Sequence, residues 1–267
     1  MSTVRDVQNK ILEIMKYIDS ICRMNGITYF IMGGTALGAI RHRGFIPWDD
    51  DLDIFMTPDQ YKKFKSVFYL LHDNQYVLQE WKTTPNYLEY AKVRMNGTTF
   101  IEHCFADRKD MHHGIYVDIM ILHKVPNNKI LQKIIYYESK YITLYALSQR
   151  RIQSLALRIL KILPNKKLVS RCYHRIYKYD TLTKDFCWCY WITPAKFKQG
   201  LFEMEYFMDV IDIPFEDTKL LGSKSIKKYL SVRYGNYMKL PSQKQQIAAV
   251  HAEIFDTEKD YLQYFNN

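Results

Sequence analysis

Residues 33–56 read GGTALGAIRHRGFIPWDDDLDIFM, and this stretch decides the fold that the sequence predicts. It holds a Gly-Gly-Thr step, a short helical segment with Arg41, a turn with Trp48, and a run of aspartates that leads into apolar residues. Successive side chains of a β-strand point to opposite faces, so Asp51 and Asp53 project to one side while the apolar residues project into a core. We therefore predict a strand with two carboxylates on one face.

This pair of carboxylates predicts a metal site. Two carboxylates held close together repel each other, so either one of them stays protonated or both share a cation. Their hard oxygen atoms suit Mg²⁺ bound together with substrate phosphates, and Mn²⁺ can take the same place. An acidic loop, in which aspartates form turns and cap helices, is the ordinary alternative. The D-x-D spacing within an apolar strand pattern favours the metal interpretation.

The step Gly33-Gly34-Thr35 predicts a turn that binds phosphate. It follows a predicted strand at 27–32 and opens onto a predicted helix. Glycine allows backbone N–H groups to approach an anion closely, and the N-terminus of a helix attracts phosphate. A phosphate cradle opposite a metal site is an arrangement suited to phosphoryl transfer.

Asp118 is the predicted third carboxylate of the site. It lies within the apolar run 115–122, which reads as a strand. A carboxylate in such a strand is costly unless it is paired, hydrogen-bonded or bound to a metal; a cap on a neighbouring turn is the alternative. Two adjacent histidines, His112 and His113, precede this strand. We do not place them among the ligands, because neighbouring side chains on a strand cannot face one site.

Lys92 and Arg94 lie two residues apart on a predicted strand at 90–95, so they share a face. Both would meet a diphosphate if this strand lay beside the carboxylate strand. On the residues alone, a solvated edge strand is the better interpretation, because lysine and arginine are common there.

Helices are predicted at 4–24, at 57–71 and around 225–234, and a further strand is predicted at 76–81. The first helix rests on apolar residues at spacings of three and four, followed by Asn25-Gly26 as its end.

The stretch 33–55 resembles the signature of the LicD family, whose members are phosphotransferases of a nucleotidyltransferase-like fold related to the fukutin proteins. The resemblance recurs at 91–94, at 114–119 and at 229–241. It implies an α+β fold, with a mixed sheet flanked by helices. It also implies transfer of a phospho-alcohol, often phosphocholine from CDP-choline or a related CDP-alcohol, to a hydroxyl of a cell-surface glycan or a lipid-linked oligosaccharide, such as a teichoic acid or lipopolysaccharide precursor.

With this resemblance, we expect a Mg²⁺-dependent phosphotransferase. Asp51, Asp53 and Asp118 are the predicted catalytic and metal-binding residues, and Asp118 or an oxygen on the metal would take the proton of the sugar hydroxyl as CMP leaves. The predicted substrate-binding residues are Gly33, Gly34, Thr35, Arg41, Trp48, Lys92 and Arg94. If the alcohol is choline, Trp48 and Phe45 are candidates for the aromatic cage of its ammonium group, with Trp81 as a third. Phe45 and Trp48 would otherwise pack the turn.

Two other classes of function stay open. A conventional nucleotidyltransferase would move the nucleoside monophosphate instead. A non-catalytic, membrane-associated assembly protein would not use the carboxylates at all.

The basic charge is concentrated in one segment. The chain of 267 residues has a net charge of +10, and residues 124–178 hold thirteen Lys or Arg against Glu138 alone. We predict a catalytic core at 1–125, a basic amphipathic helical insertion at 126–180 and a C-terminal lobe at 181–267. A basic, apolar helix at 152–163 favours an anionic membrane surface, or else a lobe with a solvated face. No nucleic-acid-binding module is recognisable.

Neither a secretory signal nor an apolar run of transmembrane length is present in the sequence. An odd number of cysteines, five, favours free thiols in a reducing compartment. We therefore predict a cytoplasmic protein, peripheral at the inner face of the plasma membrane. One group could in principle offer four zinc ligands, although buried free cysteines are the commoner outcome: Cys172, His174, Cys187 and Cys189.

Overall fold

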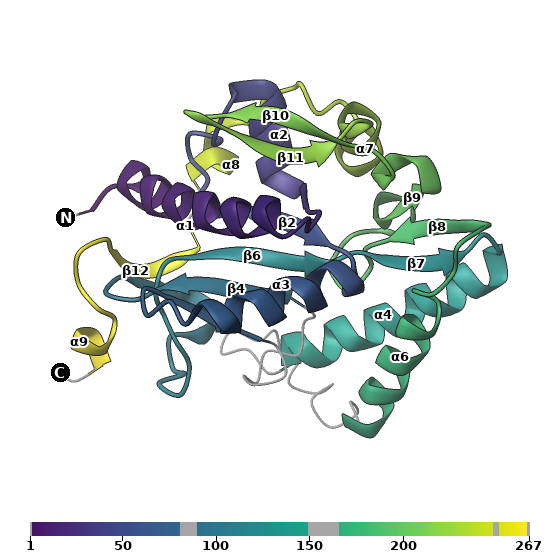
Figure 1. Cartoon of the computed structure of the whole chain (residues 1–267), viewed down its shortest axis with the longest axis horizontal. Helices are drawn as coiled ribbons and strands as arrows, with labels where there is room; N and C mark the ends of the chain where they lie inside the picture. Colours follow the sequence, from purple (N-terminus) through teal and green to yellow (C-terminus); the bar gives the residue numbers. More distant parts are fainter. Residues whose placement is uncertain (1, 81–89, 149–165, 248–250, 266–267) are drawn as a thin grey trace.

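A computed structural model describes residues 2–80, 90–148, 166–247 and 251–265. At its centre lies a five-stranded mixed sheet, and the chain has the predicted α+β class (Figure 1). The order of the strands across the sheet is β1 (Phe30–Ile31), β2 (Asp53–Met56), β6 (Tyr116–Ile121), β4 (Tyr90–Met95) and β3 (Tyr76–Gln79). Strands β2 and β6 run parallel, and the other neighbours are antiparallel.

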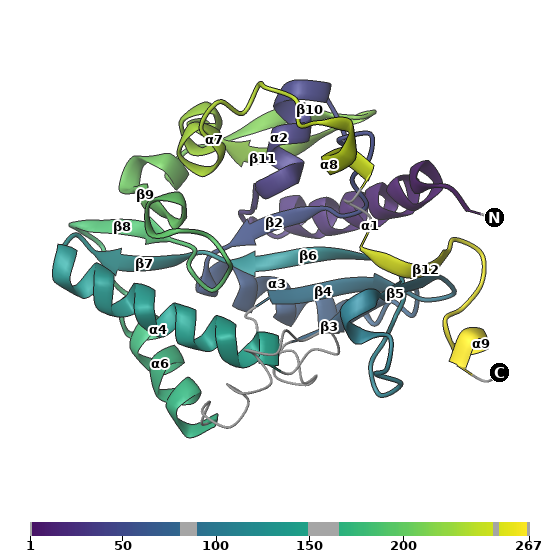
Figure 2. The same ribbon diagram turned by 180° about the vertical axis from the view of Figure 1, so that it is seen from behind.

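Two helices cover one face of this sheet: α1 (Val4–Met24) and α3 (Pro58–Leu71). Figure 1 shows them in front of the sheet, and Figure 2 shows them behind it. Helix α1 begins where Thr3 and Asp6 form a capping box, and its apolar stripe is buried. The predicted bounds of this helix are confirmed, because both its cap and its apolar period are local signals.

The carboxyl-terminal part of the chain builds a second group of elements beside β1. The hairpin of β10 (Val210–Phe215) and β11 (Thr218–Ser223) packs against β1 and α1. Helix α2 (Gly33–His42) contacts α7 (Ile226–Tyr234) and β10. The strand predicted at 27–32 has only two residues in the sheet, because the chain turns into α2 directly after them.

We define a basic lobe as α4 (Lys129–Ser148) and α6 (Lys166–Lys178) with their sheet. Its two helices lie across the molecule from the β10–β11 hairpin (Figures 1 and 2). Its three-stranded sheet consists of β7 (His123–Pro126), β8 (Phe186–Cys189) and β9 (Leu201–Glu203). An apolar cluster separate from the main core holds the lobe together, and it draws residues from both sides of the segment 126–180. The helix predicted at 152–163 lies outside the described residues, as does Trp81.

The last described strand returns to the N-terminal half of the chain. Strand β12 (Ala252–Asp256) pairs antiparallel with β5 (Thr99–Glu102). The remaining short elements are the 3₁₀ turns η1 (His103–Phe105), η2 (Phe197–Gly200) and η3 (Met204–Phe207), and the helices α8 (Gln243–Ile247) and α9 (Leu262–Phe265). Within the described ranges, the helices are all too short or too polar to span a membrane.

Candidate active site

Three adjacent strands of the central sheet place charged side chains in one row. Asp53 of β2 lies opposite Asp118 of β6, and Asp118 lies opposite Lys92 of β4. The neighbours Leu52 and Ile54 are fully buried, so the alternation predicted for the D-x-D strand is present. The structure thus brings together aspartates that are 65 residues apart in the sequence, as their numbers show.

Asp51 and Asp118 open onto a cavity of about 400 Å³. The side chain of Asp51 is 25% exposed, which leaves it accessible to a ligand. The polar part of the lining consists of Asp51, Lys92, Glu102, His103, Asp118, Thr193 and His251. A tyrosine group lies beside it: Tyr90, Tyr116 and Tyr190.

The basic lobe contacts one part of the lining of this cavity. Residues 192–194 line the cavity, and the amine of Lys140 in α4 donates hydrogen bonds to backbone carbonyls around them. Its Nζ lies 2.6 Å from the carbonyl oxygen of Thr193 and 2.5 Å from that of Ala195. Burial lowers the pKa of Lys140 to about 8.

The carboxylates of the row destabilise one another's charged forms. Burial raises the pKa of Asp53 well above its usual range, and the charges of Asp51 and Asp118 raise it further. Burial also raises the pKa of Asp118, to about 6, although the ammonium of Lys92 opposes this shift. Burial likewise raises the pKa of Asp51. The site therefore has more negative charge than its own cations neutralise, and a bound cation would reduce the repulsion between the carboxylates.

The donor atoms fit Mg²⁺, which prefers carboxylate oxygens. Asp118 Oδ1 is buried and accepts no hydrogen bond from any residue that the structure describes, although Lys92 Nζ lies 3.0 Å from it. In the described part of the chain, however, no three His, Cys, Asp or Glu side chains are already gathered closely enough to enclose an ion. The chemistry of the site fits the metal, and the carboxylates would have to draw together to bind it.

Lys92 and Arg94 share one face of β4, as predicted, but their surroundings differ. The Lys92 amine donates to Asp118 Oδ2 at 3.2 Å, lies 3.4 Å from Glu102 Oε1, and lines the cavity. Arg94 is fully buried: it donates to Glu102 at 3.1 Å, to the Gly114 carbonyl at 2.8 Å and to a β3 side chain. Arg94 therefore holds Glu102 in place, and of these two cations Lys92 is the one that lines the cavity.

Residues 33–35, the predicted glycine turn, lie against Asp49 and Asp53. Gly33 has a φ of +53°, and a Cβ atom there would lie 3.2 Å from Asp53 Oδ2. The N–H of Gly33 donates to the Tyr229 hydroxyl at 2.9 Å, and the Thr35 hydroxyl accepts from the N–H of Asp53 at 2.8 Å. Two of the polar groups predicted to cradle phosphate are thus already paired within the protein. At Gly34, a Cβ would lie 2.7 Å from an oxygen of Asp49.

Arg41 and Trp48 lie near the end of α2, and neither is among the lining residues of the cavity. Arg41 donates to the Tyr237 carbonyl at 3.3 Å and so connects α2 to the segment after α7. Trp48 is half-buried, with its ring edge-on to His42. Phe45 is buried and packs edge-to-face on an aromatic ring of β10, so of its two predicted roles the structure supports packing.

His251 is a site residue that sequence reasoning missed. Its backbone N–H donates to Asp50 Oδ2 at 2.7 Å, and its Nδ1 lies 2.6 Å from Asp50 Oδ1 and 3.8 Å from Asp51 Oδ2. The hydrogen bond to Asp50 raises the pKa of His251 to about 9. Glu102 was missed as well. Glu102 is the last residue of β5 and His251 directly precedes β12, its partner strand; no local motif marks either residue.

His112 and His113 do not line the cavity, in agreement with leaving them out of the ligand set. The Gly114 N–H donates to His112 Nδ1 at 2.9 Å, so this nitrogen is unprotonated. His112 Nε2 lies 2.8 Å from Asn96 Oδ1 and must donate to it. Burial, followed by the charge of Arg94, lowers the pKa of His112 to about 4.

This geometry predicts an acid-sensitive fold. The folded protein keeps His112 neutral below its ordinary pKa of 6.5, so stability falls as the pH drops from about 6.5 toward 4. Between pH 7 and pH 5, His112 should remove about 2 kcal/mol of unfolding free energy. In His112→Asn, the amide oxygen can still accept from Gly114 but cannot titrate. Urea unfolding at both pH values should show a smaller loss in this variant; equal losses would contradict the assignment.

The four residues considered for zinc are not grouped. Cys172 and Cys189 are buried in the apolar cluster of the lobe, whereas His174 is exposed on α6. All five cysteines are free thiols. Among the described residues, therefore, these side chains do not form a zinc site.

Comparison with known proteins finds the family that the sequence resembles. Residues 26–141 match the family described as LicD/FKTN/FKRP, nucleotidyltransferase domain. The lipopolysaccharide cholinephosphotransferase LicD of Haemophilus influenzae is 28% identical over 256 residues, which cover 91% of this chain and 94% of that protein. Over 42 residues, the ribitol 5-phosphate transferase FKRP of Homo sapiens is 40% identical, covering 16% of this chain and 8% of that protein.

The mixed sheet, its row of carboxylates and the matched segment define a nucleotidyltransferase-type domain. Residues 26–141 of this chain form a domain of this family, and the similarity to the cholinephosphotransferase over 91% of the chain supports a transferase.

Proposed function

We propose that this protein transfers a phospho-alcohol, with phosphocholine from CDP-choline as the first candidate, to a sugar hydroxyl and releases CMP. The acceptor would be a cell-surface glycan or its lipid-linked precursor. One observation carries the proposal: Asp53, Asp118 and Lys92 lie in register across three strands, and Asp51 lies beside them in a cavity. The similarity to the cholinephosphotransferase of Haemophilus influenzae supports this choice of alcohol.

In this proposal Asp51, Asp53 and Asp118 hold Mg²⁺, or Mn²⁺ in its place. When bound, the ion would neutralise the donor's diphosphate and polarise its phosphoryl oxygens.

The chain's own groups supply the rest. Lys92 faces the cavity and would neutralise charge on the transferred phosphate. Asp118 lines the cavity and would accept the proton of the acceptor hydroxyl through a carboxylate oxygen. The acceptor oxygen then bonds to the phosphorus that bears the alcohol. The bond from this phosphorus to CMP breaks, and CMP leaves with the electron pair.

The tyrosines of the cavity are better placed than Trp48 to bind choline. Aromatic ring faces attract cations, including quaternary ammonium groups. Here the Lys92 amine already lies 3.2 Å from the centre of the Tyr116 ring and 5.2 Å from that of Tyr90. We therefore propose that the ammonium of the alcohol binds against Tyr90 and Tyr190, which both line the cavity.

The products of the reaction test this function. With Mg²⁺, a panel of CDP-alcohols and glycan acceptors, the purified protein should release CMP only when the acceptor is present, and EDTA should abolish the release. Pyrophosphate released from a nucleoside triphosphate, without CMP, would contradict the proposal. That result would favour the conventional nucleotidyltransferase, the alternative suggested by the description of the matched domain.

We also propose that the protein works at the inner face of the plasma membrane as a peripheral protein. The support is the basic character of residues 124–178, of which α4 and α6 are described. Each basic residue near an anionic leaflet contributes about 1 kcal/mol of attraction.

A further inference from the structure

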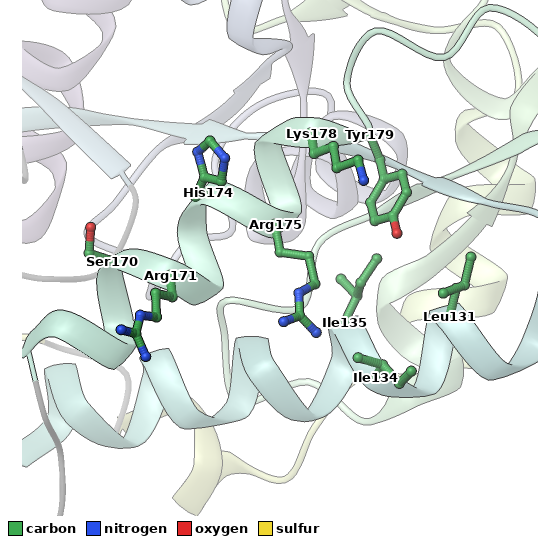
Figure 3. Close-up of a pocket in the computed structure, with 9 residues that line it drawn as sticks. All are labelled: Leu131, Ile134, Ile135, Ser170, Arg171, His174, Arg175, Lys178 and Tyr179. Carbon is green, nitrogen blue, oxygen red and sulfur yellow. The ribbon is translucent and has the colours of Figure 1, made fainter.

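A second cavity, of about 770 Å³, lies between α4 and α6 in the basic lobe (Figure 3). We call it the lobe groove. Its described lining shares no residue with the cavity that holds the aspartates, so nothing in the proposed reaction uses it. The lining consists of Leu131, Ile134, Ile135, Ser170, Arg171, His174, Arg175, Lys178 and Tyr179.

The α6 side of the lobe groove is positively charged. Helix α6 has five Lys or Arg, one His and no acid among its 13 residues. Arg171, Arg175 and Lys178 are exposed and line the groove, and Figure 3 shows Arg175 extending from α6 toward Ile135. Among the described residues, the acid in ion-pair contact with these three is Glu138, which lies 3.0 Å from Arg175. The groove therefore complements an anion.

The α4 side is apolar and partly open to solvent, because Ile134 is exposed and Leu131 half-buried, whereas Ile135 is buried. Leu131, Ile134 and Ile135 form this side of the groove, and Ile134 is 39% exposed. On the same helix Ile130 is 71% exposed and Tyr137 is 68% exposed. Apolar side chains that adjoin a row of cations suit a ligand with an anionic head and a hydrocarbon part. A sugar or a free phosphate would leave this apolar side in water.

We propose that the lobe groove binds an anionic phospholipid of the membrane, with its phosphate against Arg171, Arg175 and Lys178 and its acyl chain along Ile134 and Leu131. The lobe groove would then be the membrane-binding site of the peripheral association proposed above. This proposal does not depend on which alcohol is transferred. The groove then holds the protein at the surface where a lipid-linked acceptor would be found.

Vesicle sedimentation of the full chain tests the site. Vesicles of phosphatidylcholine with phosphatidylglycerol should bind the protein at physiological salt, and vesicles of phosphatidylcholine alone should bind it weakly. The variant Arg171→Gln/Lys178→Gln should lose at least about tenfold in partition. The matched control is Lys62→Gln/Lys63→Gln, which removes the same charge from the exposed side of α3 and should lose less than about twofold. Ile134→Ser should also weaken binding, because the acyl chain loses an apolar contact.

Equal weakening by the groove variant and the control would overturn the proposal, because attraction would then follow net charge alone. Absence of binding to anionic vesicles would overturn it as well. CMP release with a water-soluble acceptor, measured in parallel, should be unchanged in the groove variant; its loss in a folded variant would assign the groove to the reaction instead. Vesicle binding by a protein that releases no CMP would contradict the proposed function and leave the lipid site standing.

Discussion

The variant Asp53→Asn should lose transferase activity by about a thousandfold or more, and metal-free protein should at the same time become more resistant to urea. The activity falls because an amide is a poor ligand for Mg²⁺. The stability rises because burial and three neighbouring carboxylates raise the pKa of Asp53, which means that the fold opposes its charge. A carboxyl group whose pKa is raised in the folded state costs stability once the pH exceeds its pKa in the unfolded state. At neutral pH, a neutral side chain at this position therefore makes the folded protein more stable.

The measurements are CMP release and urea unfolding in EDTA, both at pH 7. Asp209→Asn is the matched control, because Asp209 is 69% exposed and lies 3.5 Å from Lys224 on the surface. It should change neither measurement by much. A folded Asp51→Ala/Asp53→Ala protein with full biological activity would show that the carboxylates are not catalytic, and it would favour a membrane-associated assembly role.

The variant Arg94→Met should lose about 3–5 kcal/mol of unfolding free energy. Arg94 is completely buried and donates to three acceptors, one of which is the carboxylate of Glu102. Without the guanidinium, the Glu102 carboxylate and the Gly114 carbonyl lose a donor inside the protein. Glu102 also lies near Lys92, so activity should fall together with stability.

Arg5→Met is the matched control for Arg94→Met. Arg5 forms two hydrogen bonds to Glu216, but its side chain is 55% exposed, so water replaces the lost contact. Urea unfolding should show a loss of less than about 1 kcal/mol. If Arg94→Met were as stable as Arg5→Met but inactive, Arg94 would face the donor, as the sequence predicts, rather than hold Glu102.

The parts of the fold that could be predicted from sequence are those with local signals. Helix α1 has a capping box and an apolar period, and Asp51 and Asp53 stand in a strand pattern that fixes the face on which they lie. The buried setting of Asp118 also follows from the apolar residues around it. Local chemistry and the family resemblance together are enough to predict the α+β class and to predict that Asp53 and Asp118 lie close together.

The parts that could not be predicted depend on pairing between distant strands. The sequence places Lys92 and Arg94 on one face of β4, but β3, Glu102 and the Gly114 carbonyl decide that Arg94 is enclosed and Lys92 is not. The hydrogen bonds from Lys140 to the carbonyls around residues 192–194 could not be predicted either, because a lysine on an amphipathic helix is ordinarily solvated. Local patterns identify candidate residues, and tertiary contacts decide which of them meet a ligand.

The pairing of β12 with β5 has a consequence for how the protein matures. A ribosome delivers residues 53, 92 and 118 long before residue 251, and chains fold progressively from the N-terminal side. The carboxylate row can therefore form while Asp50 still lacks the backbone N–H and imidazole of His251. Completion of the site waits for contacts between residues some 150 positions apart, which are among the slowest to form. During synthesis, therefore, the aspartates and Lys92 can be in register before the ribosome has delivered the residue that pairs with Asp50.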